Sequence, residues 1–366
     1  YENYTILEEL ANYFEENLQS IIDKHDYPVC QNRVGSIFTL FFHSGPIRNT
    51  KDVSEDAIEK YINDFQENFN NTSESDSDDA LSSKKINING SEINYLQLGN
   101  SNSKNILLIH GFGGDLNNWM FNQEELSKDF NVFSLDLPGH GHSDHRPSGT
   151  AYYFIDMVMD VIEAADVLGW ERFSLLGHSM GAGVATYLAG TIHEKIDYVI
   201  LIEGIGSIVQ KPEKMPEDFR ESAIQWMSRS KKQLPIYPDI ESAVKARHQV
   251  GGISKSSVRP LVERGLQPVN GGYTWRSDPI LKSKSRHYFT EEQARAFIKE
   301  ITAPVLLIEA EHTEKDHWYE LLRKRMPYLN NLQHRIVPGG HHLHLDNPEP
   351  VAMAIREFLN ICSEKT

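Results

Sequence analysis

Phe173-Ser-Leu-Leu-Gly177-His-Ser179-Met-Gly181-Ala-Gly183 is the stretch from which the fold can be deduced. Its first four residues suit a buried strand, and the residues after Ser179 suit a helix. The G-x-S-x-G spacing between them is typical of a sharp strand-to-helix turn, because the glycines let neighbouring backbone come close. The pattern places Ser179 at the head of a helix and makes it the first candidate catalytic residue.

Short apolar runs recur on both sides of this stretch and are mostly separated by helix-length segments. They lie at Ile106–Ile109, Val132–Leu135, Tyr198–Ile202, Val305–Ile308 and Gln333–Val337. Such an order predicts a mostly parallel sheet flanked by helices. Upstream, residues 86–98 alternate apolar and polar around Asn89-Gly90, which indicates a hairpin of two antiparallel strands. We therefore expect an α/β fold with an eight-stranded sheet.

One interval in this order is too long for a single crossover. About 100 residues separate the apolar run that ends at Ile202 from the one that begins at Val305. We expect residues 205–300 to form a helical cap, inserted after the sixth strand, over the edge where such sheets bind ligands. Residues 84–204 and 301–366 then form the core.

A second motif, His110-Gly111-Phe112-Gly113-Gly114, directly follows the strand expected at Ile106–Ile109. Glycines allow a loop to approach a ligand closely, and backbone N–H groups can stabilise a developing oxyanion. The amides of Phe112 and Met180 are therefore the candidate oxyanion hole. A plain strand-to-helix turn is the alternative.

A third motif, Pro338-Gly-Gly-His341-His342-Leu-His344, follows the last expected strand. A serine hydroxyl needs a neighbouring base to become nucleophilic, and the loop after the final strand can supply a histidine. Its spacing to the downstream Leu-Asp-Asn-Pro assigns His341, whereas His342 and His344 are interpreted as packing residues. A metal site formed by the three histidines is the alternative, but no cysteine or carboxylate spacing supports it. We expect no cofactor and no metal.

With these motifs, the loop that begins at Asp136 (Asp-Leu-Pro-Gly-His-Gly-His-Ser-Asp144) resembles that of the α/β-hydrolase superfamily, and the resemblance spans residues 84–366. Within it, Leu261–Leu266 and Gly271–Pro279 resemble the branch called serine hydrolase-like proteins. The resemblance implies hydrolysis of a small-molecule ester through a Ser-His-acid triad and an acyl-enzyme. A thioesterase, a lactonase and a non-catalytic ligand-binding protein are the alternatives.

The motifs do not identify the acid of this triad. The superfamily usually places an Asp where this chain has Thr313, which cannot stabilise an imidazolium by charge. Glu203 ends the preceding strand, a position that related dehalogenase-type hydrolases use, so we predict Glu203. The rival carboxylates lie near Thr313, with Glu311 as the first alternative: Glu311, Glu314 and Asp316.

Three further motif residues receive structural interpretations. The resemblance makes Asp136 part of a loop beside the pocket rather than a catalytic carboxylate. His178, next to the candidate nucleophile, is expected to pack beneath the turn. The stretch Trp275-Arg-Ser-Asp-Pro279 lies in the expected cap, where it either lines the pocket or packs behind it.

The first 83 residues differ from the rest in charge. They hold 5 Lys or Arg against 17 Asp or Glu, which is −12 of the chain's net −16. Apolar periodicity at residues 6–22 and 57–69 predicts helices, and Ile37–Phe42 suits a strand. Residues 70–83 carry four carboxylates and one large apolar side chain, so they are expected to form a disordered linker.

Residues 1–69 resemble the C-terminal region of glutamate-1-semialdehyde aminotransferase. The resemblance is carried by Leu7-Glu-Glu-Leu-Ala, Asn32–Phe42 and Gly45-Pro-Ile-Arg48. That family's cofactor-binding lysine would lie upstream of Tyr1, so aminotransferase activity is not expected from this chain. A remnant domain and the tail of a longer polypeptide are both consistent with it.

Composition excludes several classes of partner. Neither part of the chain has the clustered positive charge that binding to nucleic acid requires. Apolar runs of about five residues are far shorter than the roughly 20 needed to span a membrane. The two cysteines, Cys30 and Cys362, are too far apart in sequence for a redox or zinc motif, which favours a reducing, cytoplasmic location. The expected partner is a small ester-like substrate, and protein partners are unknown.

Overall fold

The computed structural model describes residues 30–34, 37–41, 83–229, 233–311 and 317–363. The chain divides into two compact units, residues 1–79 and 80–366. In the first unit, strands β1 (Cys30–Val34) and β2 (Ile37–Phe41) pair as an antiparallel hairpin. Strand β2 matches the prediction, whereas β1 was not foreseen. The helices predicted at 6–22 and 57–69 and nearly all of the predicted linker lie outside the described residues.

The second unit is built on an eight-stranded sheet in the order β12-β11-β8-β7-β5-β6-β4-β3. Its strands β3 and β4 run antiparallel to their neighbours and the others are parallel. Every strand predicted for this part of the chain is present: β3 (Lys84–Ile88), β4 (Ser91–Leu98), β5 (Asn105–Ile109), β6 (Asn131–Leu135), β7 (Phe173–His178), β8 (Ile196–Ile202), β11 (Val305–Ala310) and β12 (Leu332–Val337). Asn89 and Gly90 both have positive φ, as the tight turn of the β3–β4 hairpin requires.

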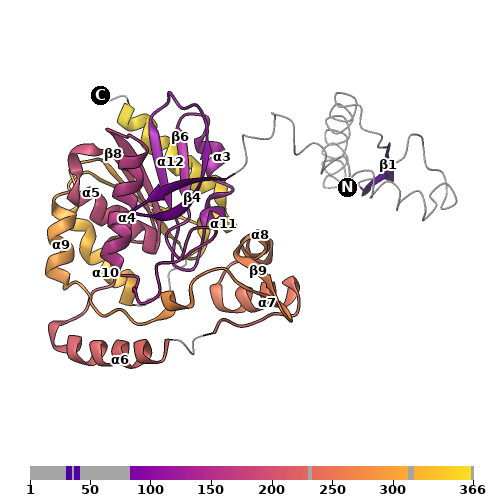
Figure 1. Ribbon diagram of the computed structural model, residues 1–366. Helices are drawn as coiled ribbons and strands as arrows, with labels where there is room; N and C mark the ends of the chain where they lie inside the picture. The colour runs from indigo at the N-terminus through magenta and orange to yellow at the C-terminus, as the bar shows by residue number, and fades with distance from the viewer. Residues whose placement is uncertain (1–29, 35–36, 42–82, 230–232, 312–316, 364–366) are drawn as a thin grey trace. The chain divides into compact units, whose positions relative to one another are not determined.

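Helices cover both faces of the sheet (Figure 1). One face packs against α4 (Phe154–Val167), α5 (Met180–Thr191), α9 (Glu291–Lys299) and α10 (His317–Arg325), the other against α3 (Gln123–Leu126), α11 (Leu343–Asp346) and α12 (Pro348–Ser363). Side chains of β7 alternate between the two layers, since Leu175 joins the first and Leu176 the second. Burial on both faces explains why the central strands are apolar throughout.

The insertion after β8 forms a cap (Figure 1). Several of its apolar side chains pack in a small cluster that also includes Leu345 of α11. The cap contains α6 (Met215–Met227), α7 (Ile240–Gly251), α8 (Lys255–Gly265), the hairpin of β9 (Leu266–Val269) and β10 (Gly272–Trp275), and the short 3₁₀ helix η7 (Pro279–Lys282). Helix α9 follows, and its Ala294 and Ile298 pack into the same core as α5. The cap that covers the sheet edge therefore ends before α9, inside the predicted interval 205–300.

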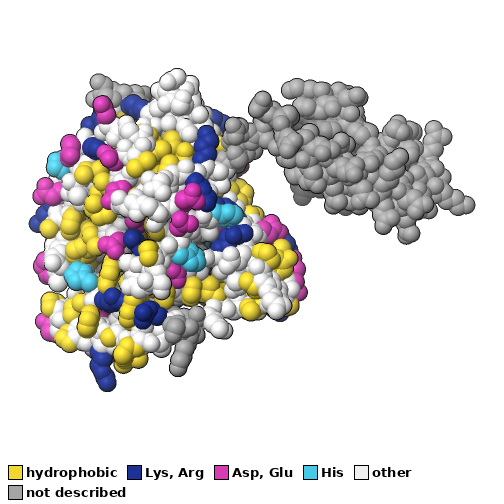
Figure 2. Space-filling view, in the orientation of Figure 1, with side chains coloured by type: hydrophobic (Ala, Val, Ile, Leu, Met, Phe, Trp, Pro, Cys, Tyr) yellow, Lys and Arg dark blue, Asp and Glu magenta, His cyan; other side chains and the backbone are white. Residues whose placement is uncertain are grey.

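Cap helix α6 carries apolar side chains on its outer surface. Phe219, Ile224 and Met227 are exposed, and Figure 2 shows hydrophobic side chains at the lower edge of the unit, where α6 lies. No helix in the described part of the chain combines the length and apolar character needed to cross a membrane.

Candidate active site

Ser179 occupies a strained turn between β7 and α5. Its backbone has φ 53° and ψ −113°, and its amide donates a 2.9 Å hydrogen bond to the carbonyl of Ile202. A Cβ on Gly177 would lie 2.3 Å from the carbonyl oxygen of Gly181, and one on Gly181 would lie 2.0 Å from that of Ile109. Only glycine fits at these two positions, so the predicted turn around Ser179 is present.

A chain of hydrogen bonds joins Ser179 to His341 and Glu203. The hydroxyl of Ser179 lies 3.0 Å from Nε2 of His341, and Nδ1 of His341 lies 3.2 Å from Oε2 of Glu203. With Nδ1 donating to the carboxylate, Nε2 is left to accept the serine proton. The His341 side chain is 37% exposed and that of Glu203 is wholly buried. The structure thus brings the three residues predicted as the triad together.

Glu203 directly follows β8 in an unusual backbone conformation. Its φ is 57°, and in the described chain only Asn89 and Ser179 share a positive φ among residues other than glycine. Such conformations cost about 1–3 kcal/mol and concentrate at functional sites. The carboxylate also accepts 2.6 Å hydrogen bonds from the Ala310 amide and the Tyr319 hydroxyl. These contacts fix one carboxylate orientation toward His341.

Tyr319 was not foreseen from the sequence. It lies on α10, more than a hundred residues from Glu203 in the chain, and only the packing of α10 beside the sheet brings the two together. No local motif marks such a tyrosine, because its role depends entirely on tertiary contact.

The rival carboxylates are placed differently. Glu311 is exposed, and its amide donates to the carbonyl of Val337 at 2.9 Å. Its side chain is not among the hydrogen-bond partners of His341. Thr313, Glu314 and Asp316 lie outside the described residues.

The candidate oxyanion hole lies beside the nucleophile. A Cβ built on Gly111 would be 3.3 Å from Cβ of Ser179, so the loop that carries Phe112 passes directly next to the serine. Met180 is the first residue of α5, where amides have no acceptor within the helix. Phe112 and Met180 line the same cavity as Ser179 and His341. Both candidate residues therefore border the same space as the candidate nucleophile.

This cavity has a volume of about 720 Å³ and lies between the sheet edge and the cap. Most of its lining is aromatic or aliphatic: Phe112, Tyr152, Tyr153, Phe154, Ile155, Met157, Met180, Ile208, Leu281, Tyr288 and Phe289. Lys284 also lines it, but its ammonium pairs with Asp218 at 2.5 Å and Glu221 at 2.6 Å. The chamber is therefore suited to an apolar group of moderate size.

The Trp275–Pro279 stretch, for which lining and packing were both open, does not line this cavity. Trp275 packs against Gly265 at the end of α8. Asp278 accepts a 2.8 Å hydrogen bond from the hydroxyl of Tyr152, which does line the cavity. The stretch supports the pocket wall from behind.

Three other histidine rings surround His341. Nε2 of His178 donates a 2.7 Å hydrogen bond to the backbone carbonyl of His341, and its ring lies 4.1 Å from the ring of His344 and 5.3 Å from that of His342. Burial lowers the pKa of His178 and His344 well below the ordinary value and that of His342 to about 3. His178 therefore packs beneath the turn as a neutral group that holds the His341 loop.

Within the described ranges, no three His, Cys, Asp or Glu side chains are arranged to hold a metal ion.

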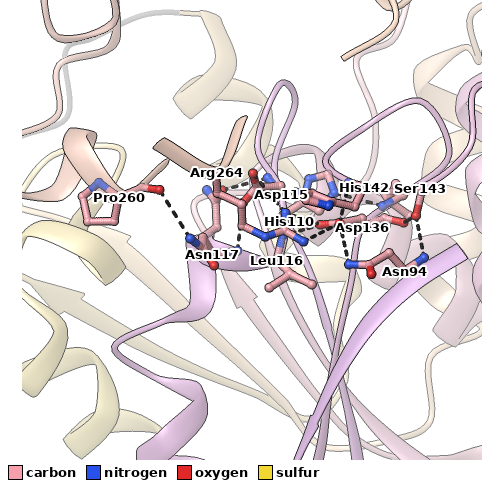
Figure 3. A network of polar contacts seen from close by, with 12 residues as sticks. Asn94, His110, Asp115, Leu116, Asn117, Asp136, His142, Ser143, Pro260 and Arg264 are labelled. Atoms are coloured by element: carbon pink, nitrogen blue, oxygen red, sulfur yellow. Dashed lines mark hydrogen bonds and ion pairs between the residues drawn. The ribbon is translucent and has the colours of Figure 1, made fainter. Parts of the chain in front are cut away.

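Asp136 does not line the cavity that contains Ser179, and its carboxylate anchors backbone. Its buried carboxylate accepts hydrogen bonds from the Asn94 side chain and from the amides of Leu116 and His142 (Figure 3). The loop after β6 is therefore held against the loop after β5. This arrangement agrees with the structural interpretation of Asp136.

Comparison with known proteins finds one matching family and several relatives of similar length. Residues 104–348 match the family described as alpha/beta hydrolase fold. A serine hydrolase-like protein of Dictyostelium discoideum is 28% identical over 70% of this chain and 75% of its own length. A serine hydrolase-like protein of Danio rerio is also 28% identical, over 71% of this chain and 83% of its own.

Two solved structures are similar to this chain in both sequence and fold. A hypothetical protein from Pseudomonas aeruginosa PAO1 is 35% identical, with a TM-score of 0.71, over 76% of this chain and 100% of its own. A thioesterase domain from the curacin biosynthetic pathway is 26% identical, with a TM-score of 0.66, over the same shares. The family match begins at residue 104, so the resemblance of residues 1–69 to an aminotransferase stays a prediction.

The buried histidines predict a loss of stability in acid. His344 is unprotonated when folded, whereas in the unfolded chain a histidine takes up a proton below about pH 6.5. The unfolded state then binds more protons, so stability present above pH 6.5 falls as the pH is lowered. Neither ring nitrogen of His344 has a hydrogen-bond partner, so His344→Leu breaks no such bond.

Urea unfolding at pH 7.5 and 5.5 measures how the free energy of unfolding changes with pH. The wild type should lose about 1 kcal/mol more unfolding free energy between the two pH values than His344→Leu does. Equal losses in both proteins would show that His344 titrates normally in the fold.

Proposed function

This chain belongs to the alpha/beta hydrolase fold family, and we propose that it is a serine hydrolase that cleaves an ester-type bond in a small molecule. The observation that carries the proposal is the continuous hydrogen-bond chain from Ser179 through His341 to the buried Glu203. A strained serine that faces a cavity and is bonded to a histidine has the geometry of an activated nucleophile.

In the proposed mechanism, Oγ of Ser179 attacks the substrate carbonyl carbon while Nε2 of His341 takes the hydroxyl proton. The amides of Phe112 and Met180 stabilise the resulting oxyanion. The alcohol leaves with the proton from His341, and the acyl group stays on Ser179. A water then gives a proton to His341 and attacks the carbonyl carbon of the acyl-enzyme. His341 passes this proton to Oγ of Ser179 as the acyl–oxygen bond breaks, which releases the acid and restores the serine. Glu203 stabilises the imidazolium in both steps.

The cavity supports an apolar acyl group as the part of the substrate that the protein holds. Aromatic and aliphatic side chains form the larger part of its lining. Polar residues such as Gln225, Lys282 and His287 also line it, and the ammonium of Lys284 is already paired with two carboxylates. A thioester is the second candidate, favoured by the similarity to the thioesterase domain. The proposed chemistry at Ser179 is the same for both.

A fluorophosphonate probe tests the nucleophile, since it labels only serines that their neighbours activate. We expect the wild type to be labelled and Ser179→Ala to lose labelling and about 10⁴- to 10⁶-fold in ester turnover. Ser207→Ala is the matched control, because Ser207 lines the same cavity but bonds to the Tyr187 hydroxyl at 2.9 Å. A folded wild type that resists the probe would instead favour the non-catalytic ligand-binding alternative.

The acid is tested by exchanging carboxylates for amides. Glu203→Gln keeps the size of the side chain but removes the charge that stabilises the imidazolium, so kcat should fall on the order of 10⁴-fold. Glu311→Gln is the control and should stay within about threefold of the wild type, because Glu311 is exposed and is not among the hydrogen-bond partners of His341. The assignment is wrong if the two effects are reversed when both are measured with a p-nitrophenyl ester.

The apolar cavity predicts a preference among acyl groups. Each methylene buried in it contributes about 0.8 kcal/mol, so kcat/KM should rise roughly threefold to fourfold per added methylene until the chamber is full. A series of p-nitrophenyl esters from acetate to decanoate measures this, and the same acyl groups on a thiol carrier test the thioester. A protein that prefers acetate throughout does not use this cavity for an acyl chain.

A further inference from the structure

Two buried carboxylates meet beside the loop of the candidate oxyanion hole. Asp136 follows β6 and its side chain is wholly buried, and Asp115 follows the glycine loop with its side chain 6% exposed. Two negative charges that are close together and shielded from water repel each other, so a buried pair needs a counter-charge.

The cap supplies that counter-charge. Arg264, near the end of α8, reaches down so that Nη1 and Nη2 donate to the two carboxylate oxygens of Asp136 at 3.0 and 2.7 Å. Its Nη1 also lies 3.2 Å from Oδ2 of Asp115. The guanidinium is only 14% exposed and lies between α8 and the core (Figure 3). A second contact from α8, the Pro260 carbonyl, accepts a hydrogen bond from the Asn117 side chain.

These carboxylates hold the segment that continues directly from the oxyanion loop. Asp136 accepts from the Leu116 amide at 2.8 Å, and Asp115 accepts from the Asn117 amide at 2.9 Å. Between this anchor and Phe112 lie only Gly113 and Gly114, which add little stiffness of their own.

The other end of the same loop is also fixed. His110 is buried, its Nδ1 donates to the Gly111 carbonyl at 2.8 Å, and its Nε2 accepts from the Leu137 amide at 3.1 Å. The position of the Phe112 amide therefore depends on two anchors, and the cap controls one of them.

We propose that Arg264 is a positioning residue, which uses Asp115 and Asp136 to hold the Phe112 amide where the oxyanion forms and so ties catalysis to correct seating of the cap. This inference rests on the proposed function. It predicts that loss of Arg264 impairs the chemical step more than substrate binding, because Arg264 itself does not line the cavity.

The planar, forked shape of the arginine guanidinium is required here as well as its charge. A guanidinium can donate to both oxygens of Asp136 and still reach Asp115, whereas an ammonium is a single point charge. Arg264→Lys should therefore recover only part of what Arg264→Met loses.

The charged groups around Arg264 also predict how the effect of its loss on activity depends on pH. Burial raises the pKa of Asp115 to about 6. Burial would also raise the pKa of Asp136, but Arg264 outweighs it and the pKa lies below its ordinary value. Other titratable groups around this pair are His110, His140 and His142, and Arg247 lines a small cavity together with Asp115. Arg264 lowers the pKa of Asp115, so without Arg264 this pKa rises further. The two carboxylates then repel each other at mildly alkaline pH, and protonation of Asp115 as the pH falls relieves the repulsion.

The experiment compares Arg264→Met and Arg264→Lys with Arg259→Met. Arg259 lies on the same helix but is exposed and pairs with Glu241 and Glu263, so its loss should change neither measurement more than about twofold. For Arg264→Met we expect kcat with a p-nitrophenyl ester, and the rate of fluorophosphonate labelling, to fall about 10- to 100-fold with KM within threefold.

Two further readouts separate positioning from general instability. The ratio of Arg264→Met activity to wild-type activity should rise as the pH falls from 8 to 6. Adding Asp115→Asn, which keeps a side-chain acceptor for the Asn117 amide, should restore at least part of the lost kcat. Circular dichroism and melting curves identify which variants are folded at the assay temperature.

The outcomes are distinct. Folded Arg264 variants that label and turn over like the wild type would overturn this inference and leave the proposed function intact. A loss confined to KM, or one that neither pH nor Asp115→Asn changes, would also overturn it. A wild type that does not react with the probe would contradict the proposed function itself.

Discussion

The turn that holds Ser179 constrains the rest of the site. It forces the serine into a left-handed φ at the carboxyl end of β7, and only glycine fits on either side of it, at Gly177 and Gly181. Because neighbouring strands of a parallel sheet end at the same edge, the residues that follow β5, β8 and β12 converge on this point. Phe112, Glu203 and His341 each come from one of those strand ends. The fold thus assembles the site from four short segments that are far apart in sequence.

The cap adds two things to this edge. It forms part of the wall of the apolar cavity of about 720 Å³ beside Ser179. It also carries Arg264, which donates hydrogen bonds to the buried carboxylate of Asp136 beside the oxyanion loop. The same insertion thus supplies the cavity shape that selects the substrate and the Arg264 charge that positions the Phe112 amide. Changes in the cap could therefore alter rate and specificity together, which is a physical reason why one sheet can serve many reactions.

Local patterns predicted the sheet and the turn that holds Ser179 well. The G-x-S-x-G turn and the Asn89-Gly90 hairpin depend on residues adjacent in sequence, so their geometry can be deduced from spacing alone. Glu203 could be predicted only because Thr313 stands where an Asp is usual and because Glu203 follows β8, at the same edge of the sheet as Ser179. Tyr319 and Arg264 could not be predicted, because each acts through a contact more than a hundred residues away. The role of each side chain follows only from the partner that tertiary packing places next to it.

The central claim is that Ser179 carries the acyl group during turnover. The most direct test is rapid acid quenching of the wild type during hydrolysis of a p-nitrophenyl ester, followed by intact mass and peptide mass spectrometry. The account predicts a mass increase of one acyl group, located on the peptide with Ser179 and lost when the substrate is consumed. Turnover of the ester with no adduct on that peptide at any quench time would contradict it.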